Sequence, residues 1–113
     1  TDLSSKAMVE KAVEELKKSG VECILCQDDY ICDEAVRKLS HMGVRIPDQM
    51  KVASCHYSRI LENYPVTVTS LKFNITELGR RSCQVLLDMI HGKTVPDKTL
   101  LDYEIILKES TKG

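Results

Sequence analysis

Apolar residues recur along this chain with two different spacings, and these predict alternating helices and strands. A spacing of three to four residues predicts three long helices, over about residues 5–19, 29–42 and 75–91. Short apolar runs and one alternating segment predict four strands, over residues 21–26, 51–55, 66–73 and 100–107. Residues 58–63 predict a short helical turn before Pro65.

The alternation of these elements predicts the fold class. Helices of this length between strands imply right-handed crossovers, so we expect an α/β fold with a mostly parallel sheet and helices on both faces, in three layers. A chain of 113 residues suffices for one domain with a core of its own. Because the first helix has no strand before it, we expect residues 1–113 to be part of a longer protein.

Composition and charge narrow the classes of function. Hydrophobic residues make up 42% of the chain, charged residues make up 29%, and the formal net charge is -1. This balance argues against a surface that itself binds nucleic acid, which usually carries a basic excess. No apolar run approaches the roughly 20 residues that cross a bilayer. We therefore expect no membrane partner.

The cysteines favour free thiols over a metal or redox site. Their number, five, is odd, which is typical of the reducing cytosol, so we expect a cytoplasmic protein. Cys23 and Cys26 have C-x-x-C spacing, but side chains three positions apart on a strand point to opposite faces. No second C-x-x-C completes a zinc site. We therefore expect buried, unreactive thiols, no metal and no cofactor.

Two of the predicted strands run directly into polar clusters. Asp28 and Asp29 follow the first strand, and His56 follows the second. If these strands are parallel neighbours, both clusters lie at the carboxyl edge of the sheet, where open α/β sheets bind ligands. We expect Asp29 to cap the next helix, which leaves Asp28 to accept hydrogen bonds from a ligand. Phe73 ends the third strand at the same edge, where its ring can stack on a flat or ring-shaped ligand.

Several segments, in order along the chain, resemble those of the LacI/GalR transcriptional regulators. Residues 26–39 resemble the family segment N-D-x-x-A-x-G-A-x-x-x-L, and residues 42–53 resemble G-x-x-V-P-x-D-x-S-V-V-G. Residues 54–58 stand where the family has G-F-D-D-S. The segments L-T-T-V-x-Q, L-G-x-x-A, I-x-G-x and V-x-R-E-S-T have similar counterparts at residues 68–73, 78–81, 90–93 and 107–111. The resemblance covers nearly the whole chain.

The resemblance implies that residues 1–113 are the C-terminal lobe of an effector-binding core with the periplasmic-binding-protein-like type I fold. Such a core binds a small effector, a sugar or related metabolite, between two lobes, and operator DNA binds a separate N-terminal domain. The implied ligand-binding residues are Asp28, His56 and Phe73, with Tyr57 beside them. The family has Asn, Asp and often Gln at the first three positions, so the resemblance leaves the effector open.

The resemblance also implies a homodimer. The family's dimer contact uses the short helix after the G-F-D-D-S loop and the start of the helix after N-D. The corresponding residues in this chain are Ile60, Leu61, Tyr64, Asp33 and Arg37. The first three offer a partly apolar face suited to a symmetric contact. The alternative is that they cover the local core.

Three other functions stand as alternatives. A transporter's periplasmic sugar-binding protein shares the fold, but export disfavours five unpaired cysteines. A phospho-acceptor receiver domain needs a carboxylate at the end of its central strand, and this chain has His56 there. An enzyme would pair Cys55 with His56, but neighbouring side chains on a strand diverge, so we expect no catalysis.

Overall fold

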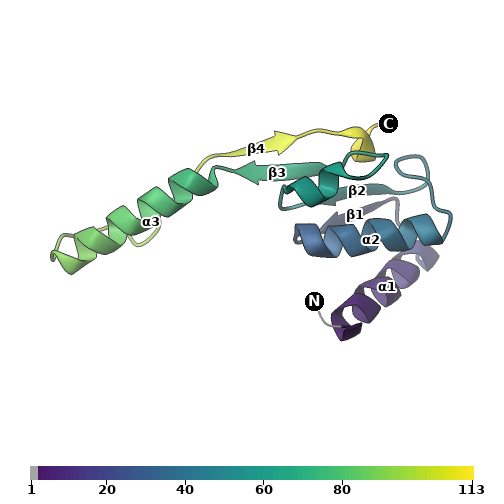
Figure 1. Ribbon diagram of the computed structural model, residues 1–113, viewed down its shortest axis with the longest axis horizontal. Coiled ribbons are helices and arrows are strands. Elements are labelled where there is room, and N and C mark those ends of the chain that lie inside the picture. Colours follow the sequence, from purple (N-terminus) through teal and green to yellow (C-terminus); the bar gives the residue numbers. More distant parts are fainter. Residues whose placement is uncertain (1–2) are drawn as a thin grey trace.

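The body of the protein is a four-stranded sheet packed together with two helices, and a third helix extends away from this body (Figure 1). The computed structural model describes residues 3–113. The helices are α1 (Leu3–Lys18), α2 (Asp29–His41) and α3 (Ile75–Ile90). The strands are β1 (Cys23–Cys26), β2 (Lys51–Ser54), β3 (Thr69–Phe73) and β4 (Tyr103–Ile106). Two short 3-10 helices are η1 (Arg59–Glu62) and η2 (Glu109–Thr111).

The sheet is mostly parallel, as the sequence predicts. Its strand order is β1-β2-β3-β4, in which β1 pairs parallel to β2 and β2 pairs parallel to β3. β4 runs antiparallel to β3, with Phe73 directly opposite Tyr103. Because β4 runs in the opposite direction, its first residue lies at the edge where the three parallel strands end.

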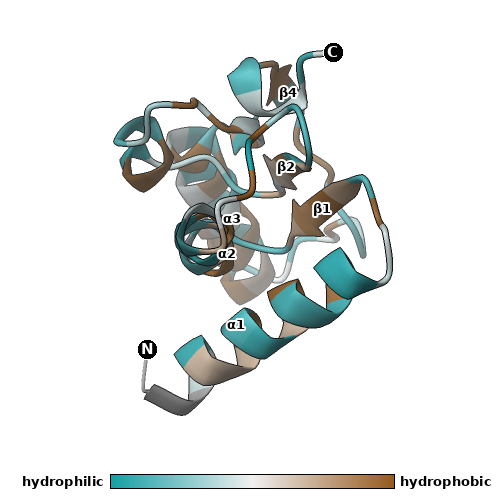
Figure 2. Ribbon diagram, turned by 90° about the vertical axis from the view of Figure 1, so that its right-hand side faces the viewer, coloured by the Kyte–Doolittle hydropathy of each residue, from teal (hydrophilic) through white to brown (hydrophobic). Residues whose placement is uncertain are grey.

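The hydrophobic core lies between α2 and one face of the sheet. α2 packs against β1, β2 and η1, and α1 packs against α2. The buried apolar side chains of this core are Val13, Ile24, Cys26, Cys32, Ala35, Val36, Leu39, Met50, Val52, Leu61 and Val68. Figure 2 shows β1 as hydrophobic and α1 as largely hydrophilic, and within residues 5–18 of α1 only Val13 is buried.

The two faces of β1 differ in exposure. Ile24 and Cys26 are buried, whereas Cys23 and Leu25 are exposed. The prediction that Cys23 and Cys26 point to opposite faces is therefore confirmed, but the expectation that both thiols are buried is wrong for Cys23. Leu25 is 68% exposed, so this face of β1 is uncovered by the described residues.

Helix α3 is where the fold departs most from the prediction. Its apolar positions predict packing on the sheet, yet none of its residues is buried and it contacts no other described helix or strand. The chain leaves the sheet at the end of β3 and returns only at β4 (Figure 1). Within residues 3–113, helices therefore cover one face of the sheet and not both. Periodicity identifies the apolar face of a helix but not the surface that it contacts.

The extended α3 gives the molecule an elongated shape. Its principal extents are 57 × 32 × 25 Å, and its radius of gyration is 17.9 Å, compared with about 13 Å for a compact domain of 100 residues. Its accessible surface is 8282 Å², compared with about 6,300 Å² for a monomeric protein of this mass. No helix among residues 3–113 combines the length and the apolar character needed to cross a membrane.

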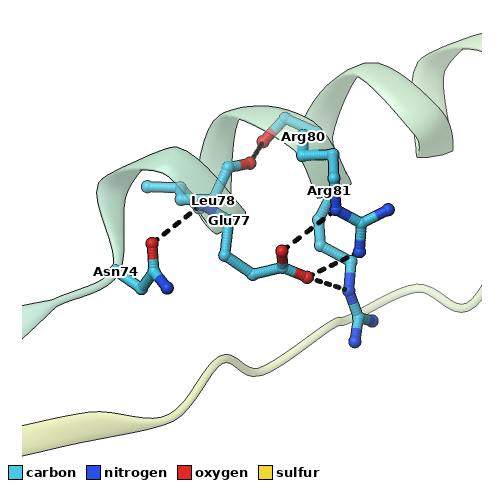
Figure 3. A network of polar contacts seen from close by, with 6 residues as sticks. Asn74, Glu77, Leu78, Arg80 and Arg81 are labelled. Carbon is cyan, nitrogen blue, oxygen red and sulfur yellow. Dashed lines mark hydrogen bonds and ion pairs between the residues drawn. The ribbon is translucent and has the colours of Figure 1, made fainter.

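The first turn of α3 is held by a network of polar contacts (Figure 3). Asn74 caps the helix, and its Oδ1 accepts a hydrogen bond from the Glu77 backbone N–H at 3.0 Å. The Glu77 carboxylate binds two guanidinium groups. Arg80 donates to it at 2.7 and 3.0 Å, and Arg81 donates at 3.0 Å.

We expect the Glu77 carboxylate to titrate far below the ordinary value of a glutamate. The hydrogen bonds from Arg80 and then Arg81 lower the pKa of Glu77 from its ordinary value of 4.5 to about 2. A pKa lowered by folding stabilises the folded state fully above pH 4.5, and this contribution is lost as the pH falls through 2. Carboxyl-detected NMR titration measures the midpoint directly.

The matched variant for this titration is the double change Arg80→Gln with Arg81→Gln, which should return the pKa of Glu77 toward 4.5. A midpoint near 4.5 in the unmodified protein would contradict the network.

Candidate functional site

The predicted site residues meet at the edge where β1, β2 and β3 end and β4 begins. A cavity of about 770 Å³ opens at this edge. His56, Tyr57 and Phe73, three of the four predicted ligand-binding residues, line it. The prediction that these residues lie together is therefore confirmed, and Asp28 is the exception because it does not line this cavity.

Backbone hydrogen bonds to the neighbouring strands hold the loop that carries His56. Cys55 N–H donates to Cys26 O, and Tyr57 N–H donates to Leu71 O, both at 2.8 Å. Between these anchors, the Ser54 hydroxyl donates to His56 O at 2.8 Å and accepts from His56 N–H at 3.2 Å. The His56 backbone is thus fixed from three sides. In the described part of the chain no hydrogen bond engages its imidazole, which can both donate and accept.

Tyr57 is held at both its ring and its hydroxyl. The hydroxyl donates to the Glu62 carboxylate, and this hydrogen bond raises the pKa of Tyr57. The Lys72 ammonium lies 5.5 Å from the centre of the Tyr57 ring, within the range of a cation–π contact. Tyr57 therefore has a fixed orientation at the cavity wall.

Asp28, not Asp29, caps helix α2, so the predicted cap is wrong by one residue. The Asp28 backbone is extended, and its Oδ1 accepts from the Ile31 N–H at 2.8 Å. Asp29 is the first residue of the helix and is buried, and its Oδ1 accepts from the Tyr30 N–H at 3.1 Å. Two adjacent carboxylates satisfy the sequence rule for a cap equally well, and only the backbone conformation distinguishes them. One oxygen of Asp28 is therefore engaged within the protein.

The predicted dimer residues lie at the contact between η1 and α2. Leu61 is 2% exposed and belongs to the core, so its assignment to a free surface is wrong. The Tyr64 hydroxyl donates to the Asp33 carboxylate, and it lies 3.3 Å from Asp33 O. Arg37 also binds Asp33, at 3.2 Å. Ile60 is half-buried and Arg37 is exposed, so these two remain available to a partner.

Sequence reasoning missed the contribution of β4 to the site. Tyr103 and its neighbours Asp102 and Glu104 line the cavity beside Phe73. The alternation over residues 100–107 predicts a strand but does not give its direction. A signal was present nonetheless, since Asp102 and Tyr103 form a polar and aromatic pair at the start of a strand.

The charged groups at the cavity have mixed sign and stay unpaired. Arg59 and Lys72 supply two cations, and Asp102 and Glu104 supply two anions. None of these four forms an ion pair with another part of the described chain. The residues that the structure describes contain no cluster of three His, Cys, Asp or Glu side chains suited to a metal ion. The cavity therefore offers hydrogen-bond donors and acceptors with no dominant charge.

Comparison with known proteins gives a consistent family assignment. The family model described as "periplasmic binding protein-like domain" matches residues 2–111. The chain is 25% identical over 89 residues to the HTH-type transcriptional repressor MelR of Bacillus subtilis (strain 168). That alignment covers 79% of this chain and 26% of MelR, so the chain spans about a quarter of that relative's length.

Solved structures share the fold over nearly the whole chain. The transcription regulator CcpA of Lactococcus lactis superimposes with a TM-score of 0.87 at 22% identity, over 95% of this chain and 40% of that chain. A complex of the transcriptional regulator CelR with cellobiose superimposes with a TM-score of 0.81 at 25% identity, over 93% of this chain and 33% of that chain.

Proposed function

The chain belongs to the periplasmic binding protein-like domain family and is of the LacI/GalR regulator type, and on this basis we propose that it senses a small effector for a transcriptional regulator. In this proposal residues 1–113 are the C-terminal lobe of the effector-binding core. The effector is a sugar or related metabolite that binds at the edge of the sheet. The regulator is a homodimer, and operator DNA binds to a separate N-terminal domain.

One observation carries the proposal. His56, Tyr57 and Phe73, which the resemblance assigns to ligand binding, line a single cavity of about 770 Å³. This size falls within the roughly 300–1,000 Å³ typical of small-molecule sites. The residues come from two separate strand ends, and their meeting at one cavity depends on the sheet order and not on sequence proximity.

The chemistry of the cavity supports an uncharged polar ligand such as a sugar. Sugar hydroxyls both donate and accept hydrogen bonds, and the unpaired Arg59, Lys72, Asp102 and Glu104 offer both kinds of partner. The two cations and two anions leave no net attraction for a strongly charged ligand. The CelR structure with cellobiose adds support from a relative of the same fold.

The exposed apolar side chains of α3 support the proposal that a second lobe forms the other wall of the cleft. Its large apolar side chains that are exposed are Ile75, Leu78, Leu86, Leu87, Met89 and Ile90. The chain superimposes over 95% of its length on CcpA, yet this covers only 40% of that protein. We therefore assign the apolar face of α3 to contact with the first lobe of the regulator, across the cleft. Five free cysteines support a cytoplasmic location.

A thermal-shift screen of the full-length protein tests the proposal. The probes are cellobiose, lactose, glucose 6-phosphate and adenosine. We expect a sugar to raise the melting temperature, because a ligand at 100 times its Kd stabilises the folded state by about 2.7 kcal/mol. The shift should disappear in His56→Ala, which removes the imidazole without touching the Ser54 hydrogen bonds to the backbone.

Two controls sharpen this screen. Asp28→Asn keeps the cap of α2, because asparagine caps helices as well as aspartate does. A change in the ligand-induced shift of this variant therefore reports a ligand contact of residue 28 and not a loss of helix stability. Tyr30→Ala removes an exposed aromatic ring that does not line the cavity, and it should leave the shift unchanged. A shift of equal size in His56→Ala would contradict the assigned site.

A further inference from the structure

We propose that Phe73 and Tyr103 together form an aromatic wall on which the ring of the effector stacks, and that Tyr103 thereby sets specificity for ring-shaped ligands. This inference rests on the proposed function, since it assigns a role within the same cavity. Tyr103 lies on β4, a strand to which the resemblance assigns no ligand-binding residue.

The pairing of β3 with β4 places the two rings on one side of the sheet. Phe73 and Tyr103 are directly opposite each other in an antiparallel ladder. Directly opposite residues point to the same face, with their Cβ atoms about 4.5–5.5 Å apart. Both side chains line the cavity, so two aromatic rings from neighbouring strands border it on the same side of the ladder.

Both rings are exposed, so the other described side chains do not cover them. Phe73 is the only phenylalanine and is 40% exposed, and Tyr103 is 61% exposed. Two other tyrosines, Tyr57 and Tyr64, have their hydroxyls bonded to Glu62 and Asp33. Among residues 3–113 no partner engages the Tyr103 hydroxyl, so both its ring face and its hydroxyl remain available to a ligand.

The groups around the wall define the chemistry of the ligand. An aromatic face binds the flat apolar face of another ring, whether the C–H face of a pyranose or a heterocycle. Lys72 and Glu104 also line the cavity, but they pair with each other on the opposite face of the β3–β4 ladder, so these charged groups border the aromatic wall. A cyclic polyol fits this arrangement, because one face of its ring is apolar and its rim carries hydroxyls.

Isothermal titration of the full-length protein with cellobiose, lactose and adenosine tests the wall. We expect Tyr103→Ala to weaken binding of the sugar at least tenfold, which corresponds to about 1.4 kcal/mol. Tyr103→Phe keeps the ring and should stay within threefold of the unmodified protein. Tyr30→Ala is the matched control, since Tyr30 is also 61% exposed but lies outside the cavity.

The outcomes separate this inference from the proposed function. Sugar binding that is equally tight in Tyr103→Ala overturns the wall and leaves the proposed function standing. Adenosine binding that depends on Tyr103, without sugar binding, supports the wall and overturns the sugar as effector. No binding of any probe to the unmodified protein contradicts both.

A fluorescent variant keeps the test decisive if Tyr103→Ala does not fold. The chain has no tryptophan, so Tyr103→Trp places a ring with its own emission at the wall. Saturation with the bound sugar should shift that emission relative to the same titration of the unmodified protein. Emission that does not change at saturation overturns the wall.

Discussion

Replacing Leu61 with alanine is expected to lower the free energy of unfolding by about 3 kcal/mol, the cost typical of truncating a buried leucine. Leu61 is 2% exposed and joins η1 to the core beneath α2. Truncation leaves a cavity that its neighbours fill only in part. Urea denaturation at a fixed protein concentration measures the loss as a lower midpoint with an unchanged slope.

Ile60→Ala is the matched control for Leu61, because the two residues are neighbours on η1 with different burial. Ile60 is half-buried, so we expect its truncation to cost about 1 kcal/mol or less. If Ile60 faces the partner in the proposed homodimer, sedimentation should show weaker dimerisation in Ile60→Ala and none of this effect in Leu61→Ala. A larger loss of stability in Ile60→Ala than in Leu61→Ala would contradict the placement of η1.

Replacing Ser110 with alanine is expected to destabilise the protein by about 3 kcal/mol, although only one oxygen atom is removed. Ser110 is fully buried on η2, where its hydroxyl donates to Val52 O at 2.5 Å and accepts from Thr69 N–H at 2.8 Å. Alanine leaves both backbone groups buried without a partner, at about 1–3 kcal/mol each. The hydroxyl therefore links the end of the chain to both central strands, β2 and β3.

Ser70→Ala provides the control for this prediction. Ser70 is 2% exposed, and within the described chain its hydroxyl has no hydrogen-bond partner. Removing an unsatisfied buried hydroxyl is close to neutral, so we expect a change within about 0.5 kcal/mol. Thermal or urea unfolding of the two variants side by side measures the difference. Equal losses for Ser110→Ala and Ser70→Ala would contradict the role of the hydrogen bonds.

The sequence predicted the elements well because local periodicity reflects local geometry. The order of helices and strands, the mostly parallel sheet and the opposite orientations of Cys23 and Cys26 followed from spacing alone. The meeting of His56 and Phe73 at one edge followed from the same reasoning, because parallel strands end at a common edge.

Features that depend on distant parts of the chain were not predictable in this way. The direction of β4 is set by its pairing with β3, so the place of Tyr103 in the site was missed. The apolar face of α3 was expected against the sheet, but the helix extends away from it. Leu61 and Ile60 look alike in the sequence, and only the packing of η1 on α2 distinguishes a core residue from a surface residue.

A crystal structure of the full-length protein with the sugar that gives the largest thermal shift will show whether the effector binds at this edge of the sheet. We predict that the sugar lies in the cavity between β2, β3 and β4. It should form a hydrogen bond with the His56 imidazole, and one face of its ring should lie against Phe73 and Tyr103. A sugar bound elsewhere on the protein, without contact to His56, would show that this edge is not the effector site.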